Sequence, residues 1–182
     1  MRKLTTHANR LGKSHANRMR TATMAVVAAI VMVSIGACSS IDCPVQNTVS
    51  TQYAFATAAG ERDTLADTLT VSTIRQNGTD SILLNRSVMT TDFSLPVSYT
   101  ANADTLQFLL ADITGHTMAD TVVVMKTNTP HFESVDCNIS FFHEITGVTF
   151  TRHFIDTIIV RNKTVNYDTS TLHFNIVRKK VQ

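Results

Sequence analysis

Short segments in which apolar and polar side chains alternate dominate the chain after its first 37 residues. Within residues 171–176, Leu, Phe and Ile alternate with Thr, His and Asn, and within residues 105–110 Leu106, Phe108 and Leu110 follow the same period. A period of two residues sends successive side chains to opposite faces of a β-strand. Capped segments with helical periodicity are missing. The pattern therefore predicts half-buried strands, with His173 and Asn175 on the solvent side of theirs.

The same periodicity predicts further strands, and turn residues separate them. Expected strands cover residues 69–74, 82–84, 121–125, 139–145 and 148–160. Asn77-Gly78 is typical of a β-hairpin, and reversals are expected at residues 58–61, 101–104, 114–116, 128–130 and 162–163. Strands spaced by about 8–12 residues are typical of sandwiches and barrels.

Threonine, which favours pleated surfaces, contributes 24 of the last 145 residues. The segment 121–125 is apolar on both faces, which favours two packed sheets. We predict an all-β fold, an antiparallel β-sandwich that is immunoglobulin-like in general architecture. A small closed β-barrel is the alternative.

The N-terminal segment has the pattern of a targeting signal. Its basic residues precede any acid, and an apolar run from Met24 to Val33 follows them. Ten residues are short for a membrane span, which needs about 20, but they fit the apolar region of a signal peptide. The basic residues are Arg2, Lys3, Arg10, Lys13, Arg18 and Arg20.

The residues Ile35-Gly36-Ala37-Cys38 resemble a bacterial lipobox. That resemblance implies cleavage after Ala37, followed by thioether lipidation and N-acylation of Cys38. The expected organisation is a signal peptide at 1–37, a lipidated tether at 38–43 and a single β-sandwich domain at 44–182. A plain signal peptide or a weak membrane anchor is the alternative.

Removal of residues 1–37 changes the charge balance. The remaining 145 residues carry ten basic and 14 acidic side chains, a formal charge of −4. A chain without a basic surplus does not condense onto a polyphosphate, so we expect no nucleic-acid partner. A domain of this length buries about 68–70% of its unfolded surface, which is enough for one core.

Two cysteines remain besides Cys38. Cys43 and Cys137 form an even pair for an oxidising compartment, so we predict a disulfide between them. It would close a loop of about 95 residues, worth about 4–5 kcal/mol in the chain-entropy model. Two separate buried thiols or a metal site are the alternatives, although isolated cysteines lack the paired spacing of zinc ligands.

The tether between Cys38 and Cys43 is short. Its residues 39–42 reach at most about 18 Å at about 3.5 Å per residue. With Cys43 held to the domain, the domain would lie against the membrane surface, and several acyl chains make such anchoring stable. The basic end Arg178-Lys179-Lys180 is expected to be a solvated tail, with contact to anionic lipid as the alternative.

Six short segments read Asp, hydroxyl residue, aliphatic residue. An Asp that bonds nearby amides can end a turn before a strand begins, and strand starts of this kind are exposed. The pattern also resembles the O-glycosylation acceptor motif of envelope proteins in the Bacteroidota, which makes the hydroxyl residues candidate acceptors. They are Thr64, Thr68, Ser81, Thr105, Thr121 and Thr157.

Three segments resemble a family of small Bacteroidota lipoproteins that is known only as a domain of unknown function. They are residues 38–44, 94–99 and 141–150. The resemblance covers essentially all of the chain after the signal peptide and implies residence in the cell envelope, without an activity or catalytic residue. Only Asp42 is acidic near Cys38, so the periplasmic face of the outer membrane is the expected location.

No catalytic motif is present. The chain lacks a Gly-x-Ser-x-Gly elbow and a glycine-rich phosphate loop, and most acids precede strands rather than face a cleft. His143 is in phase with apolar neighbours and is expected to be a hydrogen-bonded core or edge histidine. A metal site from His143, His153 and Glu144 has no supporting spacing. We therefore predict no enzyme activity, no metal and no cofactor.

The sequence favours a non-catalytic structural or accessory interaction module. Its lipid on Cys38 would hold it to the membrane, beside a partner such as an integral β-barrel protein of the outer membrane. Binding of a glycan or small ligand is the alternative, with Tyr53, Tyr99 and Tyr167 as candidate exposed aromatic residues. The absence of tryptophan weakens the case for a sugar-stacking platform.

Overall fold

The computed structural model describes residues 48–74 and 80–179, which belong to one compact unit, residues 43–182. Within these described residues the chain forms strands and no helix, and no segment qualifies as a membrane-spanning helix. The strands are β1 (Ser50–Ala56), β2 (Thr68–Thr73), β3 (Ile82–Ser87), β4 (Asp92–Pro96), β5 (Ala103–Ala111), β6 (Thr117–His131), β7 (Ser140–Phe150), β8 (Ile155–Val160), β9 (Thr164–Val165) and β10 (Phe174–Arg178).

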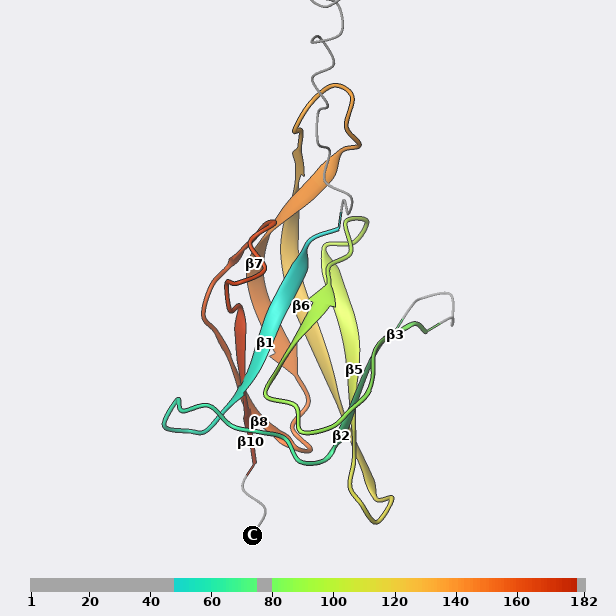
Figure 1. The fold of residues 1–182 in the computed structure, drawn as a ribbon, viewed down its shortest axis with the longest axis vertical. Helices are drawn as coiled ribbons and strands as arrows, with labels where there is room; N and C mark the ends of the chain where they lie inside the picture. The colour runs from blue at the N-terminus through green and yellow to red at the C-terminus, as the bar shows by residue number, and fades with distance from the viewer. Residues whose placement is uncertain (1–47, 75–79, 180–182) are drawn as a thin grey trace, which may run out of the picture. The chain divides into compact units, whose positions relative to one another are not determined.

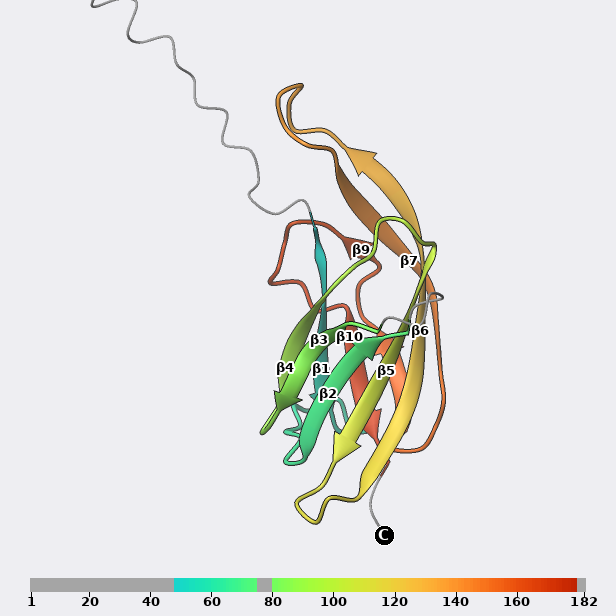
Figure 2. The same cartoon turned by 90° about the vertical axis from the view of Figure 1, so that its right-hand side faces the viewer.

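The strands form two sheets that lie as two layers (Figures 1 and 2). One sheet has the order β4-β1-β10-β8, and the other has the order β3-β2-β5-β6-β7-β9. Alternate residues of β1 and β5 point into the space between the layers and are buried, as the period of two requires. The predicted all-β sandwich is confirmed.

One strand pair differs from the predicted antiparallel pattern. β1 and β10 are parallel, with Tyr53 opposite Phe174, while the other strand pairs among the described residues are antiparallel. Parallel neighbours need a long crossover between them, and here nearly the whole domain forms that crossover. Strands β1 and β4 were themselves missing from the sequence prediction.

An aromatic cluster fills the centre of the core. The Tyr53 ring stacks on Phe93 and on Phe174 at centroid distances of 5.1 and 4.8 Å, and Phe108 meets it edge-on. Tyr53 is only 1% exposed, and burial raises the pKa of its phenol. The prediction of Tyr53 as an exposed aromatic residue is therefore wrong, because its position on β1 points inward.

The predicted turn at residues 128–130 is also wrong, since β6 continues to His131. The ladder between β6 and β7 runs out to His131 opposite Ser140, and the reversal lies at residues 132–139. β5 pairs with β6 only as far as Met125. Pro130 therefore lies where β6 has a neighbour on one side alone, which is the position where a sheet tolerates proline.

Asp120 departs from the expected placement of acids before strands. It is the fourth residue of β6 and is 1% exposed. Its carboxylate accepts hydrogen bonds from the backbone N–H groups of Phe154 and Ile155 at 2.9 and 2.8 Å. The side chain thus fastens the segment that carries the chain from β7 in one sheet to β8 in the other.

Candidate functional site

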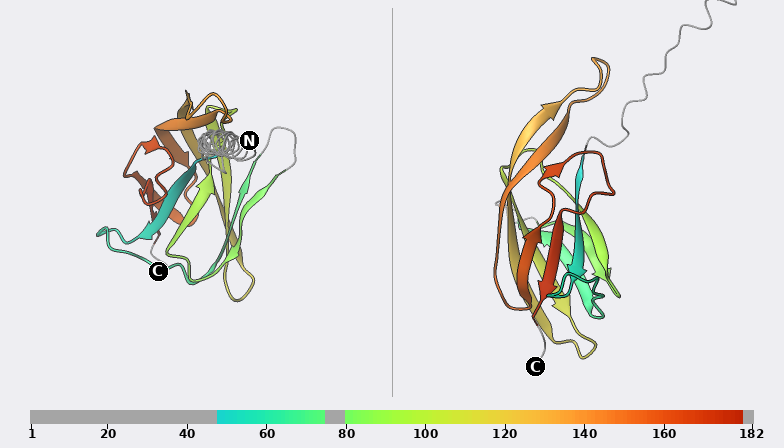
Figure 3. Two further views of the ribbon diagram at one scale, coloured as in Figure 1. Left: turned by 45° about the horizontal axis from the view of Figure 1, so that its top comes forward. Right: turned by 90° about the vertical axis from the view of Figure 1, so that its left-hand side faces the viewer.

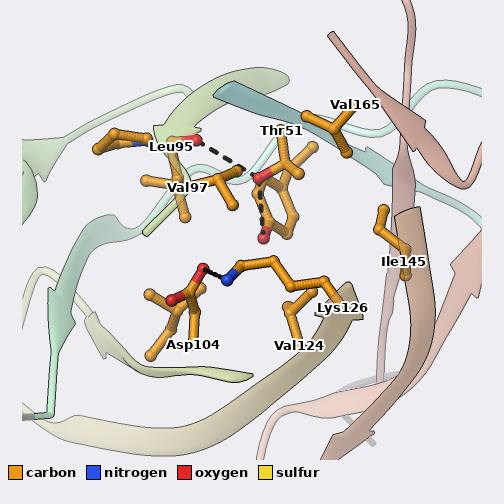
Figure 4. A pocket seen from close by; sticks show the side chains of 11 residues that line it. Thr51, Leu95, Val97, Asp104, Val124, Lys126, Ile145 and Val165 are labelled. Atoms are coloured by element: carbon orange, nitrogen blue, oxygen red, sulfur yellow. Dashed lines mark hydrogen bonds and ion pairs between the residues drawn. The ribbon is translucent and has the colours of Figure 1, made fainter. Parts of the chain in front are cut away.

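A buried ion pair lies at one end of the core (Figure 4). Lys126 occupies an inward position on β6, its side chain is 1% exposed, and its Nζ lies 3.6 Å from Asp104 Oδ2. The ammonium also donates to the carbonyls of Ser98, at 2.6 Å, and Ala101. Burial lowers the pKa of Lys126 and raises that of Asp104, and each charge opposes the shift of the other.

The space beside this pair is too small for a substrate. The cavity between Asp104, Lys126 and Tyr53 has a volume of about 10 Å³, which is close to the minimum for one water molecule. The hydrogen bonds of Lys126 instead fasten the segment between β4 and β5 to β6. This cluster therefore has a structural role.

His143 extends the same polar network. Its Nδ1 lies 2.7 Å from Asn128 Oδ1, and the Asn128 amide donates to the carbonyl of Ala101 at 3.1 Å. Burial, together with the nearby charge of Lys126, lowers the pKa of His143 to about 4. The imidazole is therefore neutral at pH 7, with Nδ1–H as the donor. The prediction of a hydrogen-bonded core histidine is confirmed.

The residues considered for a metal site have separate partners. His143 Nδ1 bonds to Asn128, whereas His153 Nδ1 lies 2.9 Å from the buried carboxylate of Asp120. Glu144 accepts a hydrogen bond from the Thr164 hydroxyl at 3.3 Å. Within the ranges 48–74 and 80–179, no group of three or more metal-ligating side chains gathers.

His173 lies inside the fold rather than on the solvent side of a strand. It is fully buried just before β10, its Nδ1 accepts the N–H of Gln52 at 3.0 Å, and its Nε2 donates to the carbonyl of Thr164 at 3.1 Å. Burial lowers the pKa of this imidazole. The predicted solvent-facing position is wrong because the chain around β1 and β9 covers it.

The loop at residues 132–139, which we call the hairpin end, projects beyond the other strands of the domain (Figure 1). Three apolar side chains on it are exposed, with Phe132 at 65%, Val135 at 98% and Ile139 at 49%. Cys137 belongs to the same loop. Exposed apolar side chains gathered on a projecting element are typical of a contact surface.

Aromatic contacts brace the base of the hairpin end. The His131 ring stacks on Phe142 across the two strands at 4.0 Å, and Tyr167 meets Phe142 edge-on at 5.0 Å. The exposed Tyr99 stacks on Phe141 at 5.4 Å. Of the predicted aromatic candidates, Tyr99 is thus exposed and Tyr167 is half-buried in this brace.

A groove of about 490 Å³, which we call the outer groove, lies on the outward face of the sheet β4-β1-β10-β8. The ribbon of this sheet is seen in Figure 3, right. Ala54 and Asn175 are opposite each other on β1 and β10 and both line the groove. Its volume is within the usual range of about 300–1,000 Å³ for small-molecule sites. The polar or charged residues that line it include Gln52, Arg62, Asp92, Arg161, Ser170 and Asn175.

The hydroxyl residues of the Asp-hydroxyl-aliphatic pattern differ in exposure. Thr64 is exposed, and its backbone N–H bonds to the side chain of Asp63 at 2.9 Å. The other five are half-buried: Thr68, Ser81, Thr105, Thr121 and Thr157. Modification of any of them stays a prediction, and Thr64 offers the most accessible hydroxyl.

The predicted anchor and disulfide involve residues beyond those described. Cys38 and Cys43 lie outside the described residues, so lipidation and the Cys43–Cys137 pairing stay predictions. Asn77-Gly78 also lies outside them. Arg178, expected in a solvated tail, is instead half-buried in β10 and donates to Asp63 Oδ2 from Nε and Nη2 at 3.0 and 2.6 Å.

Comparison with known proteins gives a family without an assigned activity. Residues 68–177 match the model of a family of unknown function (DUF6452), and the chain belongs to that family. The match spans β2 to β10 and thus includes the six-stranded sheet, the hairpin end and part of the outer groove, while β1 of the four-stranded sheet precedes it. No curated protein and no solved structure matches the chain.

Proposed function

For this member of the DUF6452 family, we propose a role as a lipid-anchored accessory module of the cell envelope. The lipid on Cys38 holds the domain to the membrane, and the hairpin end contacts a protein in that membrane. The exposed apolar side chains of Phe132, Val135 and Ile139 carry the proposal. Interfaces concentrate aromatic and aliphatic side chains in their centres, and these residues offer such a centre.

The position of Cys137 supports this assignment of the contact surface. Cys137 lies within the hairpin end, and its predicted disulfide would join that loop to Cys43, only five residues from the lipid. A tether of this length keeps the hairpin end close to the bilayer. A tethered module meets its neighbours at a high effective concentration, so even a modest apolar surface suffices for association.

The structure also offers a rigid base for this contact. The stacked rings of His131 and Phe142 and the hydrogen bond from Tyr167 to Ser140, 2.5 Å long, hold the two strands below the loop. A pre-ordered loop loses less conformational entropy on binding than a loose one. The proposed role requires no catalytic group.

Photo-crosslinking in native membranes tests the proposal. A photoreactive amino acid replaces Phe132 at the hairpin end or, as a matched control, Ile113, which is fully exposed in the turn between β5 and β6. We expect a crosslinked membrane protein with the first variant only, and its loss when Cys38→Ala is added. Equal crosslinking from both positions, or monomer alone from Phe132, would contradict the proposal.

Binding of a small ligand is the second candidate function. The observation that favours it is the outer groove, whose lining includes both polar and apolar residues and whose volume suits a small molecule. Tyrosine stacking does not support this function, because Tyr53 is buried and Tyr167 packs into the brace. The exposed Tyr99 stacks on Phe141 and does not line the outer groove.

A further inference from the structure

Asn175 contributes a side-chain amide to the outer groove. It is 8% exposed, it lines the groove, and its side-chain amide makes no hydrogen bond with another described residue. No buried side-chain nitrogen or oxygen among the described residues lacks a hydrogen-bond partner, so the amide of Asn175 reaches the solvent in the groove. Water satisfies this amide in the free protein, and a polar ligand in the groove can take the place of that water.

The neighbours of Asn175 leave space for such a ligand. On one side it pairs with Ala54 of β1, and on the other with Ile159 of β8. Ala54 has only a methyl group, so the floor of the groove stays open beside the amide. Gln52 contributes a second amide, whose nitrogen donates to the Ser94 hydroxyl at 3.2 Å and whose oxygen stays available.

Among the charged side chains that line the groove, one cation is left without an anionic partner. Arg62 is paired with Asp92, which leaves these two side chains neutral together. Arg161 follows β8, is exposed, and its guanidinium has no ion pair or hydrogen bond with another described residue. An unpaired guanidinium beside a groove binds carboxylate or phosphate with two parallel hydrogen bonds.

The uncharged polar side chains of the groove suit a ligand that carries hydroxyl groups. Ser170 lies on the rim, where its hydroxyl donates to Asp168 Oδ1 at 2.6 Å and still accepts a further hydrogen bond. The amides of Asn175 and Gln52 can each pair with a sugar hydroxyl. We infer that the outer groove binds a small anionic sugar, with its carboxylate or phosphate on Arg161 and its hydroxyls on Asn175 and Gln52.

This inference rests on the second candidate function and shares no residue with the hairpin end. Titration of the detergent-solubilised full chain tests it, with ligand-observed NMR as the readout. Glucuronate and glucose 6-phosphate separate carboxylate from phosphate, and glucose is the neutral control. We expect binding of at least one anionic sugar, and about tenfold weaker binding of glucose.

Substitutions locate the binding. Arg161→Gln and Asn175→Ala are each expected to weaken binding about tenfold or more, and Ala54→Leu to block it by filling the floor. Arg86→Gln is the matched control, because Arg86 is an exposed arginine on β3 in the other sheet. Circular dichroism checks that each variant is folded. If Asn175→Ala unfolds, Arg161→Gln still tests the inference, because Arg161 is exposed and its replacement should leave the fold intact.

Three outcomes would overturn the inference. They are no binding of either anionic sugar, binding of glucose as strong as that of the anions, and equal affinity of wild type and Arg161→Gln. Each leaves the crosslinking of the hairpin end unaffected, since that experiment probes another surface. Loss of crosslinking with retained sugar binding would refute the anchored module alone.

Discussion

Replacement of Asp120 by alanine is the most demanding test of how the two sheets are joined. The buried carboxylate accepts hydrogen bonds from the Thr151 hydroxyl at 2.7 Å and from the N–H of His153 at 2.7 Å, besides those of Phe154 and Ile155. In Asp120→Ala the buried N–H groups of Phe154 and Ile155 lose their acceptor. At about 1–3 kcal/mol for each, the expected loss is about 2–6 kcal/mol of unfolding free energy.

Urea denaturation followed by circular dichroism measures this loss. Asp112→Ala is the matched control, because Asp112 Oδ1 also accepts hydrogen bonds, from Thr114 N–H at 2.8 Å and His116 N–H at 2.9 Å. That turn is in solvent, where water replaces the lost acceptor, so the control should lose less than about 1 kcal/mol. Equal losses in the two variants would refute the argument that burial sets the cost.

The pH dependence of Asp120 follows from the same contacts. Burial alone would raise its pKa, but the N–H groups of Ile155 and His153 outweigh burial and lower the pKa below the usual 3.8. A carboxyl group with a lowered folded pKa stabilises the protein above its unfolded pKa. This stability is present at pH 5 and above and is lost as the pH falls through the folded pKa. Asp120→Asn should flatten that acid limb of the stability curve.

Three further predictions concern other parts of the chain. The imidazole of His143 should stay neutral down to about pH 4. Acidification from pH 6.5 to 4 should therefore lower the unfolding free energy of the wild type, and this loss should be absent in His143→Asn. An NMR titration midpoint near 6.5 would contradict this. Cys38→Ala should abolish palmitate incorporation and release the protein from membranes, and a variant that stays equally membrane-bound would refute the lipid anchor. If the exposed Thr64 is a glycan acceptor, Thr64→Ala should reduce the mass of protein from its native host by one glycan, and an unmodified wild-type mass would exclude this.

The strands with clear alternation were predictable from local sequence. Residues 105–110 lie within β5, with Leu106, Phe108 and Leu110 buried as their period requires. β1 was missed although it alternates too, because its outward residues include Ala54 and Ala56, which blur the contrast between the faces. The predicted reversal at residues 128–130 is too early, because Pro130 is locally typical of a turn, whereas the end of β5 decides where a proline is tolerated in β6.

The candidate sites were less predictable than the strands. His143 could be placed in the core from its phase with Ile145, since both lie on the inward face of β7. The outer groove was not predictable, because its residues come from β1, β4, β10 and three of the loops between strands. No local pattern distinguishes Arg161 from another surface arginine, or marks the outward residue Asn175 as covered.

The alternation of side chains along single segments was enough to determine an all-β chain with strands that bury one face, because that pattern depends only on backbone geometry. Which strands became neighbours was a matter of tertiary structure. The parallel pairing of β1 with β10 joins residues more than a hundred positions apart, and it alone puts Ala54 beside Asn175. Burial of Asn175 and of Lys126 is likewise a property of the assembled sheets, since contacts between distant segments determine which outward or charged positions water can reach.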